Sequence, residues 1–210
     1  GDEVVAIIDP EKKGLTSNDV IQIGGEIPVV GSFSDTKKYK PDYLVIGNAP
    51  QGGIVSDQML IEIKEAIANG VNIVNGMHEF LSKNTYLKKL AEKSGSKIID
   101  LRRPPNPPNF SKGSWRERKT PVLLVVGTDC DTGKMTTAWE IKTRLSELNK
   151  KVKFIGTGQT GILLSDGIAI DAVISDFMSG EMENLIDAKI ENDTDLIIVE
   201  GQGALSNYAY

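Results

Sequence analysis

Short apolar runs recur along the chain, and between them apolar residues return at every third or fourth position. Apolar runs bounded by turn residues are typical of buried strands, and the wider spacing is typical of amphipathic helices. Before residue 102, the runs predict strands at 4–8, 29–30, 43–46, 71–74 and 98–101. The helical spacing covers 56–69 and 79–94, which stop at Gly70 and Gly95, and glycine commonly closes a helix.

A proline-rich tract interrupts this pattern. The stretch Arg102-Arg-Pro-Pro-Asn-Pro-Pro has four prolines in five positions, which neither a helix nor a central strand accommodates. After it, the apolar runs predict strands at 122–126, 152–155, 172–174 and 195–200. Strands that alternate with helices predict α/β domains with parallel sheets. We therefore expect one domain at 1–103, a proline-rich linker at 104–119 and a second domain at 120–210.

A glycine-rich loop joins the run 122–126 to a helical pattern. Gly127-Thr-Asp-Cys-Asp-Thr-Gly-Lys-Met-Thr-Thr has the form of a P-loop, whose backbone N–H groups, helix N-terminus and lysine face a phosphate. Five residues rather than the usual four separate its glycines, and Met135 replaces the usual metal-binding hydroxyl, so Thr136 or Thr137 must take that role. The residues expected to bind phosphate are Gly127, Thr128, Asp129, Asp131, Thr132, Gly133, Lys134, Met135, Thr136 and Thr137. Cys130 lies inside the loop, where the backbone makes the contacts, so we do not expect it to act as a nucleophile.

The strand predicted at 195–200 ends in a carboxylate, Glu200, followed by a glycine turn. Ligands of open α/β sheets bind outside the carboxyl ends of the strands, so we expect Glu200 beside the P-loop, where it would hold Mg²⁺ directly or through water. The alternative is a buried strand that simply ends in an acidic residue. Of the nearby aspartates 166, 171 and 176, Asp176 is best placed to complete a metal shell, although each also suits a turn or a helix cap.

Two further groups of polar residues follow predicted strands. Gly156-Thr-Gly-Gln-Thr-Gly follows the strand at 152–155, so Thr157, Gln159 and Thr160 are candidate substrate ligands; a tight loop without a ligand is the alternative. Arg102 and Arg103 suit a substrate carboxylate or a phosphate, or else belong to a solvated linker face.

His78 is the only histidine of the chain and follows the strand predicted at 71–74. Histidine is the residue type that most readily accepts and releases protons near neutral pH, so His78 is a candidate base for an amine nucleophile, with a structural or solvated histidine as the alternative. We place it with Lys134 and Glu200 as the candidate catalytic residues.

Composition narrows the class of protein. The 210 residues are 40% hydrophobic and 25% charged, which is ordinary for a soluble globular protein and allows two domains of about 100 residues. A net charge of −5 argues against nucleic acid as the partner, and there is no long apolar run or signal sequence to predict a membrane span or export. One cysteine and one histidine exclude an intramolecular disulfide and a Cys/His zinc site. We expect a cytoplasmic protein with a small-molecule amino acid or carboxylate substrate, and a homo-oligomer is compatible with this sequence.

Two parts of the chain resemble known enzyme domains. The loop Gly127-Thr-Asp through Gly-Lys134 is similar to that of dethiobiotin synthetase, which uses ATP, Mg²⁺ and a small carboxylate. In the first half, Ile27-Pro-Val-Val-Gly-Ser, Pro41-Asp-Tyr-Leu-Val-Ile-Gly-Asn-Ala-Pro and residues 62–76 resemble the CoA-binding Rossmann domain of succinyl-CoA synthetase; a scaffold Rossmann domain without a ligand is the alternative. The resemblances imply a Rossmann-like domain followed by a P-loop domain with a doubly wound parallel sheet. Such a sheet normally continues beyond this carboxylate strand, so we expect the chain to be a fragment of a longer polypeptide, or more chain to belong with it.

The motifs in combination resemble one bacterial and archaeal P-loop family, long of unknown function, that includes D-glutamate N-acetyltransferase. They are the P-loop, Gly156-Thr-Gly-Gln-Thr-Gly-Ile, Ile170-Asp-Ala-Val-Ile-Ser-Asp-Phe, Glu200-Gly-Gln-Gly-Ala-Leu-Ser, Asn75-Gly-Met-His-Glu-Phe-Leu and Asp100-Leu-Arg-Arg-Pro-Pro. The resemblance implies acetyl transfer from acetyl-CoA to the amine of an acidic amino acid. The alternatives are an ATP- and Mg²⁺-dependent ligase or kinase acting on a small carboxylate, and a nucleotide-gated binding module without turnover.

Overall fold

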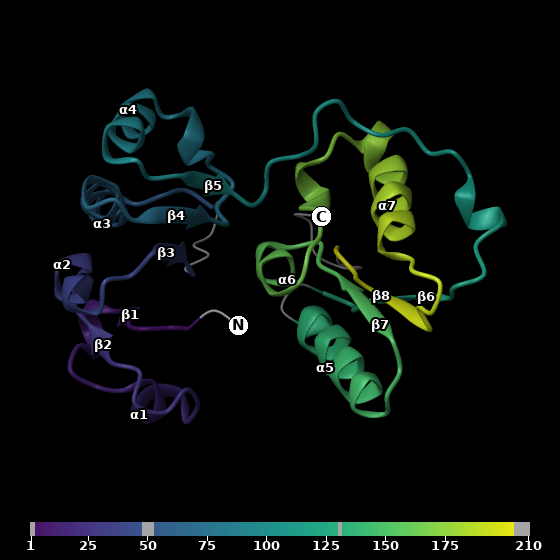
Figure 1. Cartoon of the computed structure of the whole chain (residues 1–210), viewed down its shortest axis with the longest axis horizontal. Helices are drawn as coiled ribbons and strands as arrows, with labels where there is room; N and C mark the ends of the chain where they lie inside the picture. The colour runs from purple at the N-terminus through teal and green to yellow at the C-terminus, as the bar shows by residue number, and fades with distance from the viewer. Residues whose placement is uncertain (1–2, 48–52, 130–131, 204–210) are drawn as a thin grey trace. The chain divides into compact units, whose positions relative to one another are not determined.

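The structure, a computed structural model, describes residues 3–47, 53–129 and 132–203. They form two compact units that divide between Asp100 and Leu101 (Figure 1). In each unit the paired strands are parallel, and helices are interspersed between them in the sequence. The predicted α/β class with parallel sheets is therefore confirmed.

The first unit contains a two-stranded sheet, β1-β2, and a three-stranded sheet in the order β3-β4-β5. Its strands are β1 Ile7–Ile8, β2 Val29–Val30, β3 Tyr43–Ile46, β4 Asn72–Asn75 and β5 Ile98–Asp100. Its helices are α1 Ser17–Ile21, α2 Phe33–Thr36, α3 Asp57–Ala68 and α4 Thr85–Ser94, with 3₁₀ turns η1 Pro10–Lys12, η2 Lys37–Tyr39 and η3 Leu81–Lys83.

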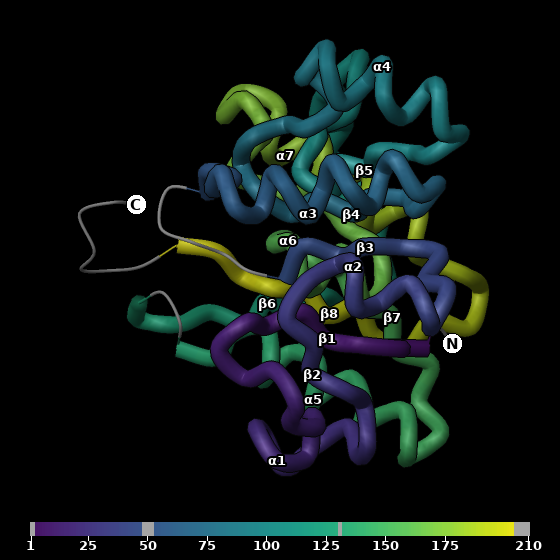
Figure 2. The backbone as a smooth tube through the Cα atoms, turned by 90° about the vertical axis from the view of Figure 1, so that its left-hand side faces the viewer, coloured from purple at the N-terminus to yellow at the C-terminus, as the bar shows by residue number. Residues whose placement is uncertain are grey.

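The core of this unit forms where α3 lies next to α4 and packs against β4 (Figure 2). Ile63 and Ile67 of α3, Leu87 of α4 and Ile73 of β4 are fully buried together. Burying a side chain of this size contributes about 1.5–3 kcal/mol, so each of these residues stabilises the unit substantially.

The helix predicted at 79–94 begins later than expected, at Thr85. The side chain of Asn84 accepts hydrogen bonds from the N–H groups of Tyr86 and Leu87 and so caps the first turn. The residues before it form the separate turn η3, because Asp100 accepts hydrogen bonds from the backbone N–H groups of Leu81 and Ser82.

The second unit has a three-stranded sheet in the order β6-β8-β7. Its elements are β6 Val122–Val125, α5 Lys134–Glu147, β7 Val152–Ile155, α6 Gln159–Leu164, α7 Ser175–Lys189 and β8 Leu196–Glu200, with 3₁₀ turns η4 Ser114–Arg116 and η5 Ile170–Ala172. The last strand in sequence is therefore the middle strand in space.

Helices α5 and α7 cover opposite faces of this sheet (Figure 1). Successive side chains of a strand point to opposite faces, and the two core clusters follow that alternation. Phe154 and Ile198 pack with α5, whereas Ile197 and Val199 pack with α7. Each of β7 and β8 is thus buried on both sides, as expected for parallel strands.

The strand predicted at 172–174 is wrong. Residues 170–172 form the 3₁₀ turn η5, and the apolar residues Ile170 and Val173 are buried against Phe177 and Met178 of α7 rather than in a sheet. The sequence interpretation also placed no helix at α6 or α7. The spacing of Met178, Met182, Leu185 and Ile186 is the signal that would have identified α7.

The segment at 109–114 lies along α7 through hydrogen bonds to two buried glutamates. Glu181 accepts hydrogen bonds from the backbone and side-chain N–H groups of Asn109, at 2.7 and 2.9 Å. Glu183 accepts hydrogen bonds from the Ser111 hydroxyl and from the N–H groups of Lys112 and Ser114. A Cβ added to Gly180 would lie 2.2 Å from the Asn109 carbonyl oxygen, so only glycine permits this close approach.

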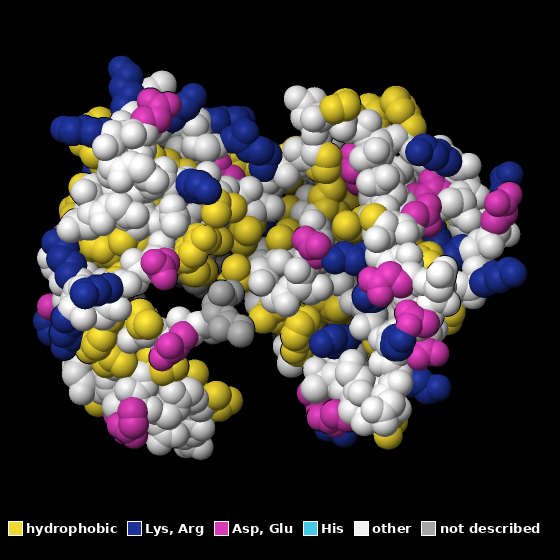
Figure 3. Space-filling view, in the orientation of Figure 1, with side chains coloured by type: hydrophobic (Ala, Val, Ile, Leu, Met, Phe, Trp, Pro, Cys, Tyr) yellow, Lys and Arg dark blue, Asp and Glu magenta, His cyan; other side chains and the backbone are white. Residues whose placement is uncertain are grey.

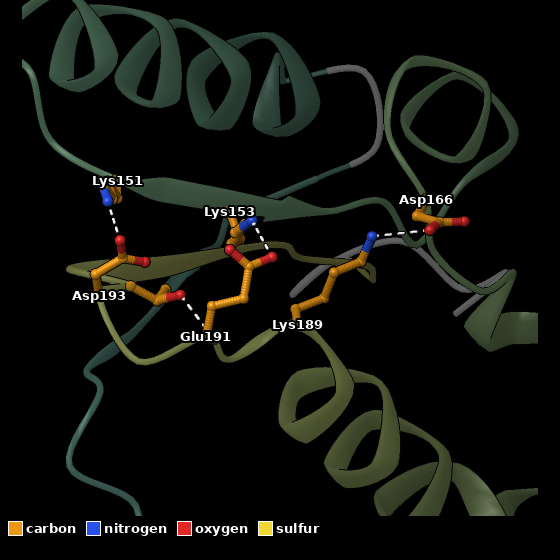
Figure 4. Close-up of polar contacts among 7 residues, drawn as sticks. Lys151, Lys153, Asp166, Lys189, Glu191 and Asp193 are labelled. Carbon is orange, nitrogen blue, oxygen red and sulfur yellow. Dashed lines mark hydrogen bonds and ion pairs between the residues drawn. The ribbon is translucent and has the colours of Figure 1, made fainter.

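Acidic and basic side chains are interspersed on the face of the second unit shown in Figure 3. Beside β7, Lys151 pairs with Asp193, Lys153 with Glu191 at 2.7 Å, and Lys189 with Asp166 at 2.8 Å (Figure 4). Exposed pairs of this kind contribute little stability each, but they neutralise the lysines locally. None of the described helices is both long and apolar enough to span a membrane.

Glu183→Gln should destabilise the protein in a pH-dependent way. The hydrogen bonds to this carboxylate, first among them that from the Lys112 N–H, lower the pKa of Glu183 to about 2 from an ordinary 4.5. A lowered folded-state pKa stabilises the fold above the ordinary value, and this stabilisation is lost as the pH falls from 4.5 towards 2. Thermal unfolding should show a midpoint about 3–6 °C lower for the variant at pH 7, with the difference shrinking below pH 4.5. Glu117→Gln, at an exposed position of the same unit, is the control; a pH-independent difference would contradict the assignment.

Candidate functional site

The P-loop lies between β6 and α5, and two of its side chains donate hydrogen bonds to the start of the loop. The Lys134 ammonium donates a hydrogen bond to the Asp129 carbonyl oxygen at 2.6 Å, and the Thr132 hydroxyl donates to the same oxygen at 2.9 Å. A Cβ added to Gly127 would lie 2.3 Å from the Thr132 hydroxyl, so glycine is required where these side chains cross the chain. Within the described residues, the Lys134 ammonium is therefore held at the Asp129 end of the loop.

The start of α5 suits an anion. Gly133 adopts a left-handed conformation with φ of 83°, and this turns the chain into a helix that no side-chain hydrogen bond caps at its N-terminus. The first N–H groups of a helix have no acceptor within the helix and carry partial positive charge, so an uncapped start can donate to a phosphate.

Met135 and the two threonines that follow it lie in different surroundings. Met135 packs against the core below α5, and its thioether offers no oxygen to Mg²⁺, whereas Thr136 and Thr137 are exposed in the first turn. Two residues of the predicted loop, Cys130 and Asp131, lie outside the described residues. Phosphate binding by this loop stays a prediction.

Glu200 ends β8, the strand between β6 and β7. It stands opposite Val125 in the register of β6 and β8, and the Gly201 N–H donates to the Val125 carbonyl oxygen at 2.9 Å. The carboxylate strand therefore ends beside the strand that leads into the P-loop, as expected from the parallel arrangement.

The Glu200 carboxylate is buried and braces the turn after β7. Its Oε2 accepts hydrogen bonds from the N–H groups of Thr157 and Gly158, at 2.8 and 3.2 Å. The Thr157 hydroxyl donates to the Glu200 carbonyl oxygen at 2.8 Å and lies 3.0 Å from Gln202 Nε2, which donates to it. Thr157 is only 2% exposed and its hydroxyl is used inside the protein, so its expected role as a substrate ligand is not supported.

The glycines at 156–161 are explained by packing. A Cβ added to Gly156 would lie 2.1 Å from the Gly161 carbonyl carbon, and one added to Gly161 would lie 2.4 Å from Glu200 Oε2. Residues 156–161, which were predicted as a loop, include the start of α6. This helix packs directly on the end of β7 and on the Glu200 carboxylate. Close packing alone therefore requires glycine at positions 156 and 161, whereas a Cβ added to Gly158 would lie 3.3 Å from Gln202 Nε2.

Arg102 does not have the free guanidinium expected of a substrate ligand. It is 5% exposed, and it donates to Gln159 Oε1 at 2.8 Å and to an Asp171 carboxylate oxygen. The ion pair with Asp171 neutralises its charge within the second unit, so its expected role as a substrate ligand is not supported, and its burial excludes a solvated linker face. Arg103 and Thr160 are exposed, and their expected substrate contacts stay predictions.

Two of the three aspartates considered for a metal shell form ion pairs within the protein. Asp166 pairs with Lys189 and Asp171 with Arg102, and Asp176 is exposed in the first turn of α7. Within the described ranges, no three His, Cys, Asp or Glu side chains gather as a metal-binding group. Mg²⁺ at Glu200 and Thr136 would rely on ligand phosphates and water, a coordination that this ion commonly adopts.

His78 lies on an ordered loop of the first unit, after β4. Asn75 Nδ2 donates to Asp100 Oδ1 at 2.7 Å and Asn75 Oδ1 accepts from the Met77 N–H at 3.1 Å, which fixes the loop. The imidazole is exposed and lies against Gly53, where an added Cβ would be 2.2 Å from His78 Cδ2. Because His78 and the P-loop belong to different units, the expected catalytic group of His78, Lys134 and Glu200 stays a prediction.

Comparison with known proteins identifies both halves of the chain. Residues 10–104 match a domain of unknown function described as the Rossmann-like domain DUF1611_N, and residues 109–210 match the P-loop domain DUF1611_C. A crystal structure of a DUF1611 family protein from Anabaena variabilis is similar over 98% of this chain and 60% of its own, with a TM-score of 0.90 and 36% identity.

Two curated relatives carry a functional name. A D-glutamate N-acetyltransferase from Pseudoalteromonas is 41% identical over 180 residues, which are 85% of this chain and 53% of the relative. Another D-glutamate N-acetyltransferase, from Tritonibacter scottomollicae, is 38% identical over 168 residues, which are 80% of this chain and 49% of the relative. The chain thus spans about half the length of the curated relatives it matches.

Lys134→Ala should abolish the stabilisation of the protein by P-loop ligands. Acetyl-CoA, CoA, ATP and ADP are screened by thermal shift with and without Mg²⁺, and a ligand at a hundred times its Kd stabilises by about 2.7 kcal/mol. The alanine variant loses the ammonium that reaches over the loop, whereas Lys150→Ala, at an exposed position beyond α5, should behave like the wild type. Equal ligand shifts in all three proteins would place the ligand elsewhere.

Gly161→Ala should destabilise the second unit by about 1–3 kcal/mol, because the added methyl group overlaps the Glu200 carboxylate. Urea unfolding measures the loss. Gly47→Ala is a matched control, since an added Cβ there meets no atom within 4 Å. A Gly161→Ala protein as stable as the control would show that the carboxylate does not lie against this turn.

Proposed function

Because the chain belongs to the DUF1611 family, with its Rossmann-like and P-loop domains, we propose that it transfers an acetyl group from acetyl-CoA to the amine of an acidic amino acid such as D-glutamate. The observation that carries the proposal is the 41% and 38% identity to two proteins named D-glutamate N-acetyltransferase. The folded P-loop supports it, since CoA carries phosphates that backbone N–H groups and a lysine can hold.

In the proposed reaction, the amine nitrogen attacks the thioester carbonyl carbon, the C–N bond forms and the C–S bond breaks. The ammonium loses one proton before the attack, the nitrogen loses a second proton as the amide forms, and the CoA sulfur leaves as a thiolate that takes up this second proton. Lys134 and the start of α5 bind the donor's phosphates. Glu200, at the middle strand of the same edge, or His78 of the first unit takes the amine proton.

A second candidate is an ATP- and Mg²⁺-dependent ligase or kinase acting on a small carboxylate. The observation that favours it is the placement of an exposed threonine, Thr136, in the first turn of α5 and of a carboxylate, Glu200, at the neighbouring strand end. These are the groups that hold Mg²⁺ and phosphate in phosphoryl transfer, whereas acetyl transfer needs no metal.

Release of free thiol from acetyl-CoA tests the proposal. We expect release with D-glutamate, unchanged by EDTA, and a loss of about tenfold or more in kcat/KM for Lys134→Ala, because charge-assisted hydrogen bonds contribute about 1.5–3 kcal/mol. Lys150→Ala is the control. L-glutamate and D-aspartate define the acceptor, and absence of thiol release with all three amino acids would reject acetyl transfer. ADP formation that requires Mg²⁺ and a carboxylate would establish the second candidate instead.

A further inference from the structure

Arg102 lies in a buried polar cluster beside the turn that Glu200 braces. Its Nη1 donates to Gln159 Oε1 at 2.8 Å and its Nη2 donates to Asp171, while its Nε is buried without a hydrogen-bond partner. A guanidinium can only donate hydrogen bonds. Each of its partners must therefore present an oxygen towards it.

This requirement orients the side-chain amide of Gln159. A glutamine amide has an accepting oxygen at one end and an NH₂ donor at the other, and its two orientations are distinguished by the hydrogen bonds it makes. Because Arg102 binds the oxygen, the NH₂ group points away from Arg102. In the described part of the chain, Gln159 Nε2 donates to no acceptor, and the residue is half-buried.

Gln159 begins α6 directly after Gly158, whose N–H donates to the Glu200 carboxylate. It therefore belongs to the turn after β7, while the P-loop follows β6, and β8 with Glu200 lies between these strands. Neighbouring strands are about 4.8 Å apart, so the two loops leave the sheet about 10 Å apart, on either side of the carboxylate. This edge thus has the predicted phosphate-binding loop on one side of Glu200 and an unpaired amide donor on the other.

We propose that Arg102 is a positioning residue that fixes the Gln159 amide so that Nε2 donates to a carboxylate oxygen of the amino-acid substrate. The inference rests on the proposed function and deepens it. The donor's phosphates bind at the P-loop, the acceptor's carboxylate binds at Gln159, and the acceptor's amine lies near Glu200 between them. Arg102 itself does not touch the substrate, because its charge is paired with Asp171 beneath the turn.

Gln159→Glu separates this role from a purely structural one. A glutamate keeps an oxygen for Arg102, so the buried cluster is retained, but it has no N–H donor and repels a carboxylate. We expect a KM for the amino acid about tenfold or more higher, from the loss of a charge-assisted hydrogen bond, with the KM for acetyl-CoA within about twofold and no fall in the unfolding midpoint. Asn184→Asp makes the same chemical change at an exposed position of α7 and should leave both constants unchanged. An unchanged KM for the amino acid, or an equal rise in both constants, would overturn the proposal.

Arg102→Met tests the positioning step, because methionine has no N–H group, so the Gln159 amide loses the donor that selects its orientation. The KM for the amino acid should rise while the KM for acetyl-CoA stays within about twofold. If this variant does not fold, the Gln159→Glu variant still tests whether the Gln159 amide binds the substrate carboxylate.

Binding of D-glutamate alone distinguishes this inference from the proposed function. In the full wild-type chain, the side-chain NH₂ signals of Gln159 in ¹⁵N NMR should shift on addition of D-glutamate and not on addition of CoA. A shift without thiol release would reject acetyl transfer and retain the amide site. Thiol release without a shift would reject the amide site and retain acetyl transfer.

Discussion

The ligand-facing edge of the second unit depends on the hydrogen bonds between the Glu200 carboxylate and the turn after β7. A carboxylate at the end of a middle strand is costly to bury unless its oxygens are satisfied. Here one oxygen accepts hydrogen bonds from the N–H groups of Thr157 and Gly158, so backbone donors satisfy it. The same contacts fix where β7 ends and α6 begins. The P-loop on one side and Gln159 on the other are therefore both placed relative to this one side chain.

Buried acidic and basic groups connect the polypeptide before β6 to this sheet. Glu181 and Glu183 of α7 bind the backbone at 109–114, and Arg102 reaches Gln159 and Asp171. Removing one partner of such a buried pair leaves an unsatisfied charge, which costs more than the pair itself contributes. The proline-rich segment is consequently part of the second unit's structure, and through Arg102 it influences the orientation of a polar group at the candidate site.

Several features of the site were predictable because they are local. The P-loop follows from the spacing of Gly127, Gly133 and Lys134 between an apolar run and a helical pattern, and Glu200 follows from an apolar run that ends in a carboxylate. Other features were missed because they depend on contacts distant in the sequence. Residues 172–174 were predicted as a strand because periodicity cannot distinguish apolar residues buried against a helix from those buried in a sheet. Arg102 was predicted as a ligand because its partners, Asp171 and Gln159, are distant in the sequence and no local pattern indicates them.

The sequence by itself determined the α/β class, the parallel strands and the chemistry of the phosphate loop, since strand and helix periodicity and glycine geometry act over a few neighbouring residues. Only the tertiary structure decided which polar side chains remain available. Thr157 and Arg102 carry groups suited to binding a substrate, yet both are buried and hydrogen-bonded within the protein, whereas Gln159 keeps an unpaired donor. The physical reason is that a hydrogen-bonding group is available to a ligand only when the fold has not already supplied its partner, and those partners come from residues 40 to 70 positions away in the chain.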